Sequence, residues 1–290
     1  MKCKGMVRFC IGLFMAAMLL TSAPARAEIT VQPTAELGFL RALRHGIQIG
    51  EGTYEFDYVR EGGQEILLPY SRFEVLANLG ERHELAFLYQ PLTLVTATRI
   101  DRSGGITIDN VVFADDTPLN LKYGFDFYRL TYRFRLLDEC WTLSLGGGLQ
   151  LRNASIVFDG FDTDGEEARV ITQDLGPVPV ISLALRRSFA NERFFESTIE
   201  GFYAPVRYLN LRDVDVVGWL YDVSFKAGAP LAGVGEVFLV ARFLGGGADG
   251  TAGEGRYWTQ SQAEPRFTNN VLDLVIVGLG ARLILPEYGG

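Results

Sequence analysis

The stretch from residue 128 to 152, YRLTYRFRLLDECWTLSLGGGLQLR, places arginines at regular steps among apolar residues. Arg129, Arg133 and Arg135 alternate there with tyrosine, leucine and phenylalanine. A guanidinium group binds carboxylates through charge-assisted hydrogen bonds that fit in pairs. Arginines at this spacing therefore predict ion-pair chemistry within an ordered structure, provided that carboxylates face them.

Other charged residues follow the same alternation along the chain. The basic positions are Arg72, Arg129, Arg133, Arg135, Arg152, Arg186, Lys226, Arg242 and Arg282, and the acidic positions are Glu55, Asp57, Glu74, Glu84, Glu196, Glu200, Asp222 and Glu236. The two signs are nearly balanced, so nearly every charge can find a partner. Such a network can act as a plug that holds a lumen shut, or it can line a selective conduit.

The elements that carry these charges repeat with a period of two, which is the period of a β-strand. In residues 141–152 the odd positions are apolar or glycine, whereas the even positions are threonine, serine, glycine, glutamine and arginine. The same split appears in ISLALRR (181–187), FFESTIEGFY (194–203) and VGWLYDVSFKA (217–227). One face of each strand is therefore apolar and the other is polar.

The lengths of these segments favour a membrane-crossing barrel over a soluble sandwich. Sandwich strands usually have about five or six residues, whereas these segments run about nine to twelve residues, a length that matches a tilted membrane-crossing strand. Short connections at 80–83, 137–140, 189–193 and 228–234 alternate with long ones at 96–120, 153–176, 205–214 and 245–270. The sequence predicts an all-β fold, a single transmembrane antiparallel up-and-down β-barrel of about ten strands with long outer loops, with eight or twelve strands as alternatives.

Residues 1–27 have the layout of a secretory signal peptide. Lys2, Lys4 and Arg8 precede an apolar run from Ile11 to Leu20, and small residues end the segment at Ala27. We expect residues 28–290 to form one outer-membrane barrel domain that keeps Cys140 as its single cysteine.

The whole chain has 27 Lys plus Arg against 35 Asp plus Glu. This acidic balance argues against nucleic-acid binding.

A barrel gives the arginines a physical reason to lie on one face. An arginine that faces lipid at mid-depth costs about 2–4 kcal/mol, so we expect the charged set to point inward, where carboxylates offset the cost of desolvation. A barrel of about eight strands is just filled by side chains, and open porins have 16 or more strands. A ten-stranded barrel with this interior should hold at most a narrow water-lined path.

The first strand is the uncertain one. The segment TYEFDYV (53–59) fits a strand with Tyr54, Phe56 and Tyr58 outward and with Glu55 and Asp57 inward. Residues 34–50 alternate poorly and have leucines at helical spacing. They are interpreted either as a helix that plugs the lumen or lies on the membrane, or as the approach to the first strand.

Enzymatic activity is not expected. Hydrolytic chemistry in such barrels generally needs a histidine as a general base, and the chain has only His45 and His83. His83 lies in a short turn at the periplasmic end, and no Ser or Asp can be assigned to His45 from spacing. No cofactor or metal is expected, although the acidic segment 159–167 leaves calcium as a minor hypothesis. A surface enzyme that acts on lipid or peptide is the alternative function.

The chain resembles the uncharacterised porin-like outer-membrane β-barrel proteins, in its alternating strands and in phrases such as YGFDFYRLTYRF, LGPVPV and GFYAPVRYLN. The resemblance implies residence in the outer membrane, insertion by the barrel-assembly machinery, and contact with membrane lipid and lipopolysaccharide. It brings no catalytic residues. The ending ARLILPEYGG departs from the terminal aromatic residue of such barrels. We expect a structural or passive role: envelope integrity, surface interaction, for which Tyr257 and Trp258 are candidates, or limited permeation of small solutes.

Overall fold

A computed structural model describes residues 29–205, 215–231, 233–252 and 266–285. The predicted leader, Tyr257, Trp258 and the chain end from Pro286 lie outside these residues. Within them no helix is long and apolar enough to cross a membrane.

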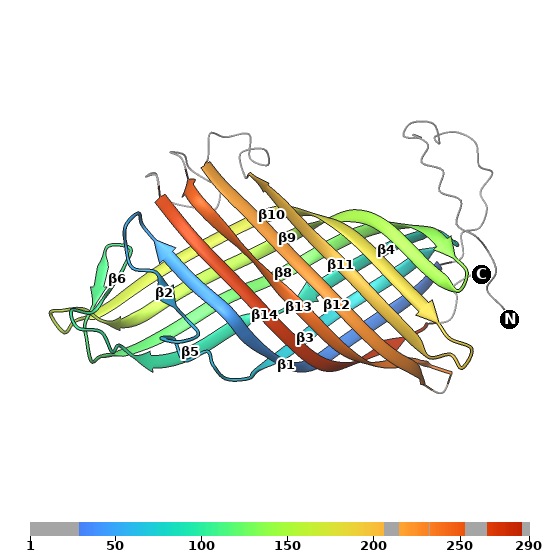
Figure 1. Ribbon diagram of the computed structural model, residues 1–290, viewed down its shortest axis with the longest axis horizontal. Helices are drawn as coiled ribbons and strands as arrows, with labels where there is room; N and C mark the ends of the chain where they lie inside the picture. The colour runs from blue at the N-terminus through green and yellow to red at the C-terminus, as the bar shows by residue number, and fades with distance from the viewer. Residues whose placement is uncertain (1–28, 206–214, 232, 253–265, 286–290) are drawn as a thin grey trace.

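Ten antiparallel wall positions form a closed barrel, in agreement with the predicted fold class. Figure 1 shows the strands strongly tilted, with β1 completing the ring against β14. Going around the ring, the wall strands are β14 (Arg266–Leu283), β13 (Gly235–Ala252), β12 (Asp215–Leu231), β11 (Phe194–Pro205), β10 (Glu167–Ser188), β9 (Trp141–Phe161), β8 (Pro118–Asp138), β4 (His83–Gln90) continued by β5 (Thr93–Arg99), β3 (Leu68–Leu79) and β1 (Ile29–Ile49).

An apolar belt surrounds the part of the barrel nearest the short turns. Its side chains are large, exposed and apolar, which is unusual for a surface in water and normal for one in lipid. They include Leu37 and Phe39 on β1, Phe73 on β3, Phe87 on β4, Leu130 on β8, Leu149 on β9, Ile181 on β10, Ile199 on β11, Phe225 on β12, Leu239 on β13 and Val277 on β14. The belt ends where the outward residues become polar, as at Asp126 after Tyr128 on β8 and at Asn153 after Leu151 on β9.

The strands extend well beyond this belt, which corrects the predicted long loops. β8 and β9 each have 21 residues and β10 has 22, so most of 153–176 is strand and only residues 162–166 form the turn. The alternation continues above the belt with polar residues outside, such as Asp159 and Arg169, and apolar residues inside, such as Ile156 and Phe158. The part of the barrel beyond the belt, the upper barrel, therefore has a polar outer face and an apolar interior.

The first strand differs from both predictions. Residues 34–49 belong to β1 rather than to a helix, and they pair with β14 on one side and β3 on the other. The register with β14 shifts between Ala42 and Arg44, where a β-bulge inserts Leu43. A bulge reverses the inside–outside order beyond it, and this reversal is why the segment alternates poorly.

The segment TYEFDYV is not a wall strand. Only Phe56–Asp57 forms a short strand, β2, which pairs with β1. Phe56 and Tyr58 are fully buried rather than facing lipid, and Asp57 accepts hydrogen bonds from the amides of Val59 and Arg60. The connection 50–67 therefore folds inward and closes part of the barrel mouth.

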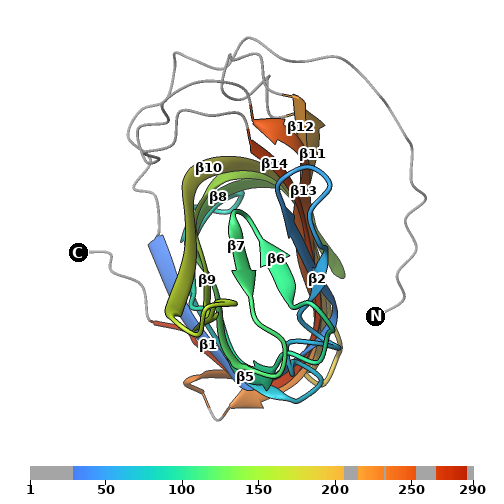
Figure 2. The ribbon, with the colours of Figure 1, turned by 90° about the vertical axis from the view of Figure 1, so that its left-hand side faces the viewer.

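A second connection also covers the mouth. The hairpin of β6 (Ile106–Ile108) and β7 (Val111–Phe113) lies within the outline of the barrel mouth in Figure 2. Phe113 is fully buried and forms an isolated bridge with Asp162 at the β9–β10 turn. Together with segment 50–67 and the upper wall strands, this hairpin encloses a large apolar cluster, which we call the outer core.

Candidate functional site

The lumen has two layers, a charged one inside the apolar belt and the outer core above it. The centre of the charged layer is Asp222 on β12. Its carboxylate oxygens lie 2.9 Å from Arg72 Nη1, 3.0 Å from Arg129 Nη1 and 2.5 Å from Arg242 Nη1. Arg72 is on β3 and Arg129 on β8, and each of these strands is four wall positions away from β12. These two ion pairs therefore cross the lumen instead of following the wall.

Glu36 on β1 links this centre to the neighbouring charges. It accepts a hydrogen bond of 2.9 Å from Arg242 Nη2 and one of 3.1 Å from the Tyr70 hydroxyl, and it lies 2.9 Å from Lys226 Nζ. Glu200 completes the set by pairing with Arg129. We call Glu36, Arg72, Arg129, Glu200, Asp222 and Arg242 the central cluster.

The central cluster is almost completely removed from solvent. The side chains of Arg129 and Asp222 are each 1% exposed. Gln90 accepts from Arg72 at 2.8 Å, and Gln150 accepts from Arg129 at 2.9 and 2.6 Å. A buried ion is tolerated when partners satisfy its hydrogen bonds as well as its charge. The interior at this level is therefore a packed polar layer.

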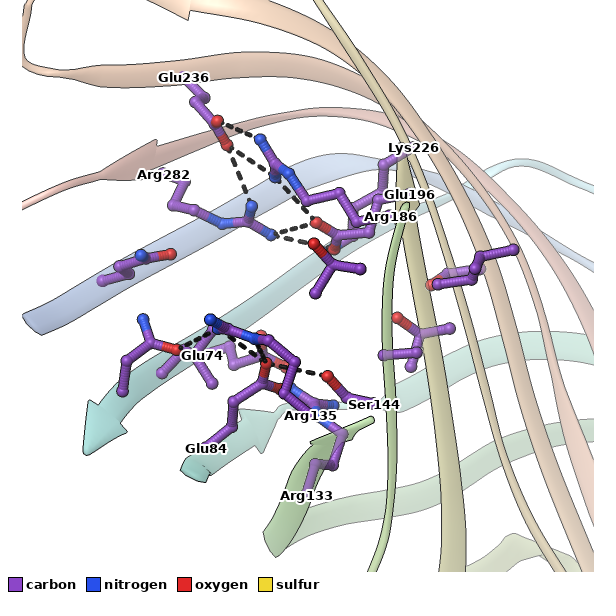
Figure 3. A pocket seen from close by; sticks show the side chains of 18 of the residues that line it. Glu74, Glu84, Arg133, Arg135, Ser144, Arg186, Glu196, Lys226, Glu236 and Arg282 are labelled. Carbon is purple, nitrogen blue, oxygen red and sulfur yellow. Dashed lines mark hydrogen bonds and ion pairs between the residues drawn. The ribbon is translucent and has the colours of Figure 1, made fainter. Parts of the chain in front are cut away.

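Below the central cluster a cavity of about 330 Å³, which we call the vestibule, opens toward the short-turn end. Figure 3 shows the charged side chains that line this vestibule. One group surrounds Glu84, which accepts from Arg133 at 3.0 Å, from Arg135 at 3.1 Å and from the Ser144 hydroxyl at 3.0 Å. These residues come from β4, β8 and β9, which are neighbours in the wall.

A second group lies across the vestibule from the first. Arg282 on β14 donates to Glu196 on β11 and to Glu236 on β13, each at 3.0 Å. Arg186 on β10 pairs with both of these carboxylates. Glu74 also lines the cavity, and within the described residues it has no ion pair within 4.0 Å. The vestibule wall thus carries paired charges along its sides, and the central cluster forms its floor.

The structure brings most of the predicted lumen residues together. Arg152 lies at a different level, because it is on β9 in register with Phe127, one inward position above Gln150 and the central cluster. Glu55 and Asp57 lie outside the network, since they belong to the inward-folded segment 50–67. Sequence reasoning missed Glu36, because the bulge in β1 hid the strand on which it lies.

The outer core contains His45, which is the most unusual titratable group in the upper barrel. Its Nδ1 lies 2.6 Å from Gln64 Oε1, and its ring stacks on Tyr58 and meets Tyr123 edge-on at centroid distances of 4.1 and 4.3 Å. Its neighbours on the outward face, Arg44 and Asp273, are polar, so His45 lies beyond the apolar belt. Burial lowers the pKa of His45 to about 4.

This burial predicts that acid weakens the attachment of segment 50–67. The pKa of His45 falls from 6.5 when it is unfolded to about 4 when it is folded, so the opened state binds the proton more readily between these values. The free energy that holds segment 50–67 in place therefore has its full value above pH 6.5 and is about 3 kcal/mol smaller near pH 4. Hydrogen exchange of segment 50–67 should show this loss, and His45→Phe should remove most of it; equal pH dependence in the two proteins would contradict the assignment.

The other candidate positions are occupied by structural contacts. His83 begins β4 at the short-turn end, and its Nδ1 lies 2.8 Å from the Tyr132 hydroxyl. In the acidic segment, Asp159 pairs with Arg169, and Asp162 accepts hydrogen bonds from the amides of Asp164 and Glu166. The described residues contain no group of three or more His, Cys, Asp or Glu placed to hold a metal ion.

Comparisons with known proteins give distant structural similarity only. No family model and no curated protein matches the chain. Among solved structures it is similar to the outer membrane protease OmpT from Escherichia coli, with 12% identity, a TM-score of 0.48, and coverage of 92% of this chain and 99% of that one. It is also similar to the Pseudomonas putida toluene transporter TodX (8% identity, TM-score 0.32, 91% of each chain) and to Ail, the attachment invasion locus protein of Yersinia pestis (9%, 0.32, 87% and 98%).

The names of these proteins give a protease, a toluene transporter and an attachment protein. The closed wall of ten strands and the lipid-facing apolar belt are properties of the chain itself. The chain has the fold of an outer-membrane β-barrel.

Proposed function

We propose that this protein is a closed outer-membrane β-barrel with a structural or passive role, and that its lumen does not conduct ions. The observation that carries the proposal is the position of Asp222, which binds Arg72 and Arg129 across the lumen and Arg242 on the neighbouring strand. An ion that passed this level would have to displace charges that are already paired and desolvated. The outer core above it adds an apolar barrier that ions cross even less readily.

The proposal includes no catalytic activity. Two positions support this: His45 is 1% exposed inside the outer core, and His83 lies at the short-turn end with its ring hydrogen-bonded to Tyr132. A general base must reach a substrate proton, directly or through one water. Neither histidine lies at the outer rim, where a surface hydrolase would need it.

Single-channel recording tests the proposal. The refolded chain without residues 1–27 is inserted into a planar bilayer, and an open porin inserted under the same conditions serves as the positive control. We expect the porin to give steady current and this protein to give none at the same voltages. Steady, ion-selective openings of the native protein would show instead that the arginines line a conduit.

A further inference from the structure

The outward face of β1 changes from apolar to basic at the upper edge of the belt. Leu37 and Phe39 are 61% and 60% exposed within the belt. Arg41 and Arg44 follow, and both are exposed. Leu43 lies between them and is 58% exposed. Two guanidinium groups and a leucine therefore lie together at the level where lipid tails give way to headgroups.

The bulge in β1 produces this grouping. In an uninterrupted strand Arg44 would alternate with Leu43 and point inward, like Ala42. Because the register shifts between Ala42 and Arg44, Arg44 pairs with Asp273 on the outer face and His45 points into the outer core. Bulges re-aim side chains and are typical of barrel rims and functional positions. Here one inserted residue brings a second arginine next to Arg41.

The positive charge of the pair is not used within the described part of the protein. Neither Arg41 nor Arg44 has a hydrogen bond or ion pair with a described residue, whereas the central arginines each have several. Asp273, the nearest carboxylate in register, accepts a hydrogen bond of 2.8 Å from the Tyr221 hydroxyl. An anion from outside the protein can therefore approach both guanidinium groups.

Exposed apolar side chains lie beside the two arginines. Leu40 on β1 pairs with Leu68 on β3, so the residues that precede β3 run next to β1. Two of them, Ile66 and Leu67, are 54% and 65% exposed. Together with Leu43 they continue the belt upward on this side. A molecule with acyl chains and an anionic headgroup fits this surface better than a free anion or a soluble protein does.

We propose that Arg41 and Arg44 bind the phosphate group of a lipid in the outer leaflet, with its acyl chains against Phe39, Leu43 and Leu67. Guanidinium groups match phosphate oxygens with paired hydrogen bonds, and basic residues at the membrane surface favour anionic lipids. The inference depends on the outer-membrane location in the proposed function and not on the closed lumen. Conductance tests the lumen and lipid binding tests this surface, so either can fail alone.

Lipid retention measured by native mass spectrometry of the detergent-solubilised barrel tests the proposal. The probes are lipopolysaccharide and the same lipid after chemical removal of its phosphates. The test variant is Arg41→Gln with Arg44→Gln. The matched control is Arg82→Gln with Arg193→Gln, which removes the same charge from exposed positions at the short-turn end.

We expect the native barrel and the control to retain the phosphorylated lipid equally. The test variant should bind it roughly 30-fold less tightly, the effect of two basic residues at an anionic surface, and dephosphorylated lipid should bind the native barrel as weakly. Equal binding by the native barrel and the test variant would overturn the proposal, as would equal retention of the two lipids or an equal loss in the control. Displacement of the lipid by millimolar inorganic phosphate would assign the surface to free phosphate instead.

Discussion

Replacing Asp222 with asparagine is expected to lower the free energy of unfolding by about 3–5 kcal/mol, the usual cost of removing one partner from a buried ion pair. The side chain keeps its size, but Arg72, Arg129 and Arg242 lose the charge that they share. Glu36 and Glu200 remain, so the folded barrel should still form with an excess positive charge in its interior. Denaturant unfolding of the barrel in lipid vesicles, followed by tryptophan fluorescence, measures the loss.

Asp159→Asn is the matched control, because it removes the same charge from a pair on the outer surface. Asp159 pairs with Arg169, and their side chains are 37% and 59% exposed. Exposed pairs contribute about 0–1 kcal/mol, so the control should unfold almost as the native protein does. If Asp222→Asn cost no more than Asp159→Asn, the cross-lumen pairs would not hold the barrel together.

The wall and the inward charges could be predicted because lipid imposes a strict rule on each strand. Outward residues must be apolar within the belt, so Arg129 and Arg133 can point only inward once β8 is recognised as a membrane strand. Their partners Glu84, Glu200 and Asp222 follow the same rule on β4, β11 and β12. The pairing itself could not be predicted, since alternation fixes the face of a residue but not which strand lies opposite.

The first strand could not be predicted from alternation, because the bulge at Leu43 breaks it. Residues before the bulge place Glu36 and Leu40 inward on even numbers, whereas His45 and Ile47 beyond it point inward on odd numbers. A single period of two therefore cannot fit both halves of the strand. Two half-strands of opposite phase, joined at a single residue, are the signal that would have revealed β1 and with it Glu36.

The strands of the upper barrel could not be predicted from alternation for a different reason. Above the belt the outer face meets water, so Asn153, Asp159 and Gln173 interrupt the lipid-facing pattern without ending the strands. Alternation persists, with Ala154 and Ile156 inside. The length of a membrane-crossing strand, about 9–11 residues, therefore limits the belt but not the sheet, and the outer core fills the part that rises above it.

We expect the outer core and the central cluster to act as two barriers in series, so that the barrel carries no current when only one of them is opened. Tyr58 is fully buried against His45, Tyr123 and Phe158. Tyr58→Ala removes about 3–5 kcal/mol of packing and should free segment 50–67 from the mouth. Ions that enter there still meet the paired charges of the central cluster, so we expect no current from this variant.

The single variant Arg129→Ala should also give no current in a planar bilayer. It removes the bonds to Glu200, Asp222 and Gln150, but the outer core still covers the path. Combining Arg129→Ala with Tyr58→Ala should open both barriers and give discrete current steps in a planar bilayer. The control combines Arg129→Ala with Val95→Ala, whose side chain is 63% exposed on the outer surface of β5, and should stay silent.

The single variants decide which barrier matters. Current through Arg129→Ala alone would mean that the outer core lets ions pass, and current through Tyr58→Ala alone would mean the same for the central cluster. A silent double variant would mean that the remaining pairs, such as Arg242 with Glu36 at 2.9 Å, close the lumen without Arg129. Only the pattern of two silent singles and one conducting double supports two barriers in series, because current along one path requires every obstacle on it to be open.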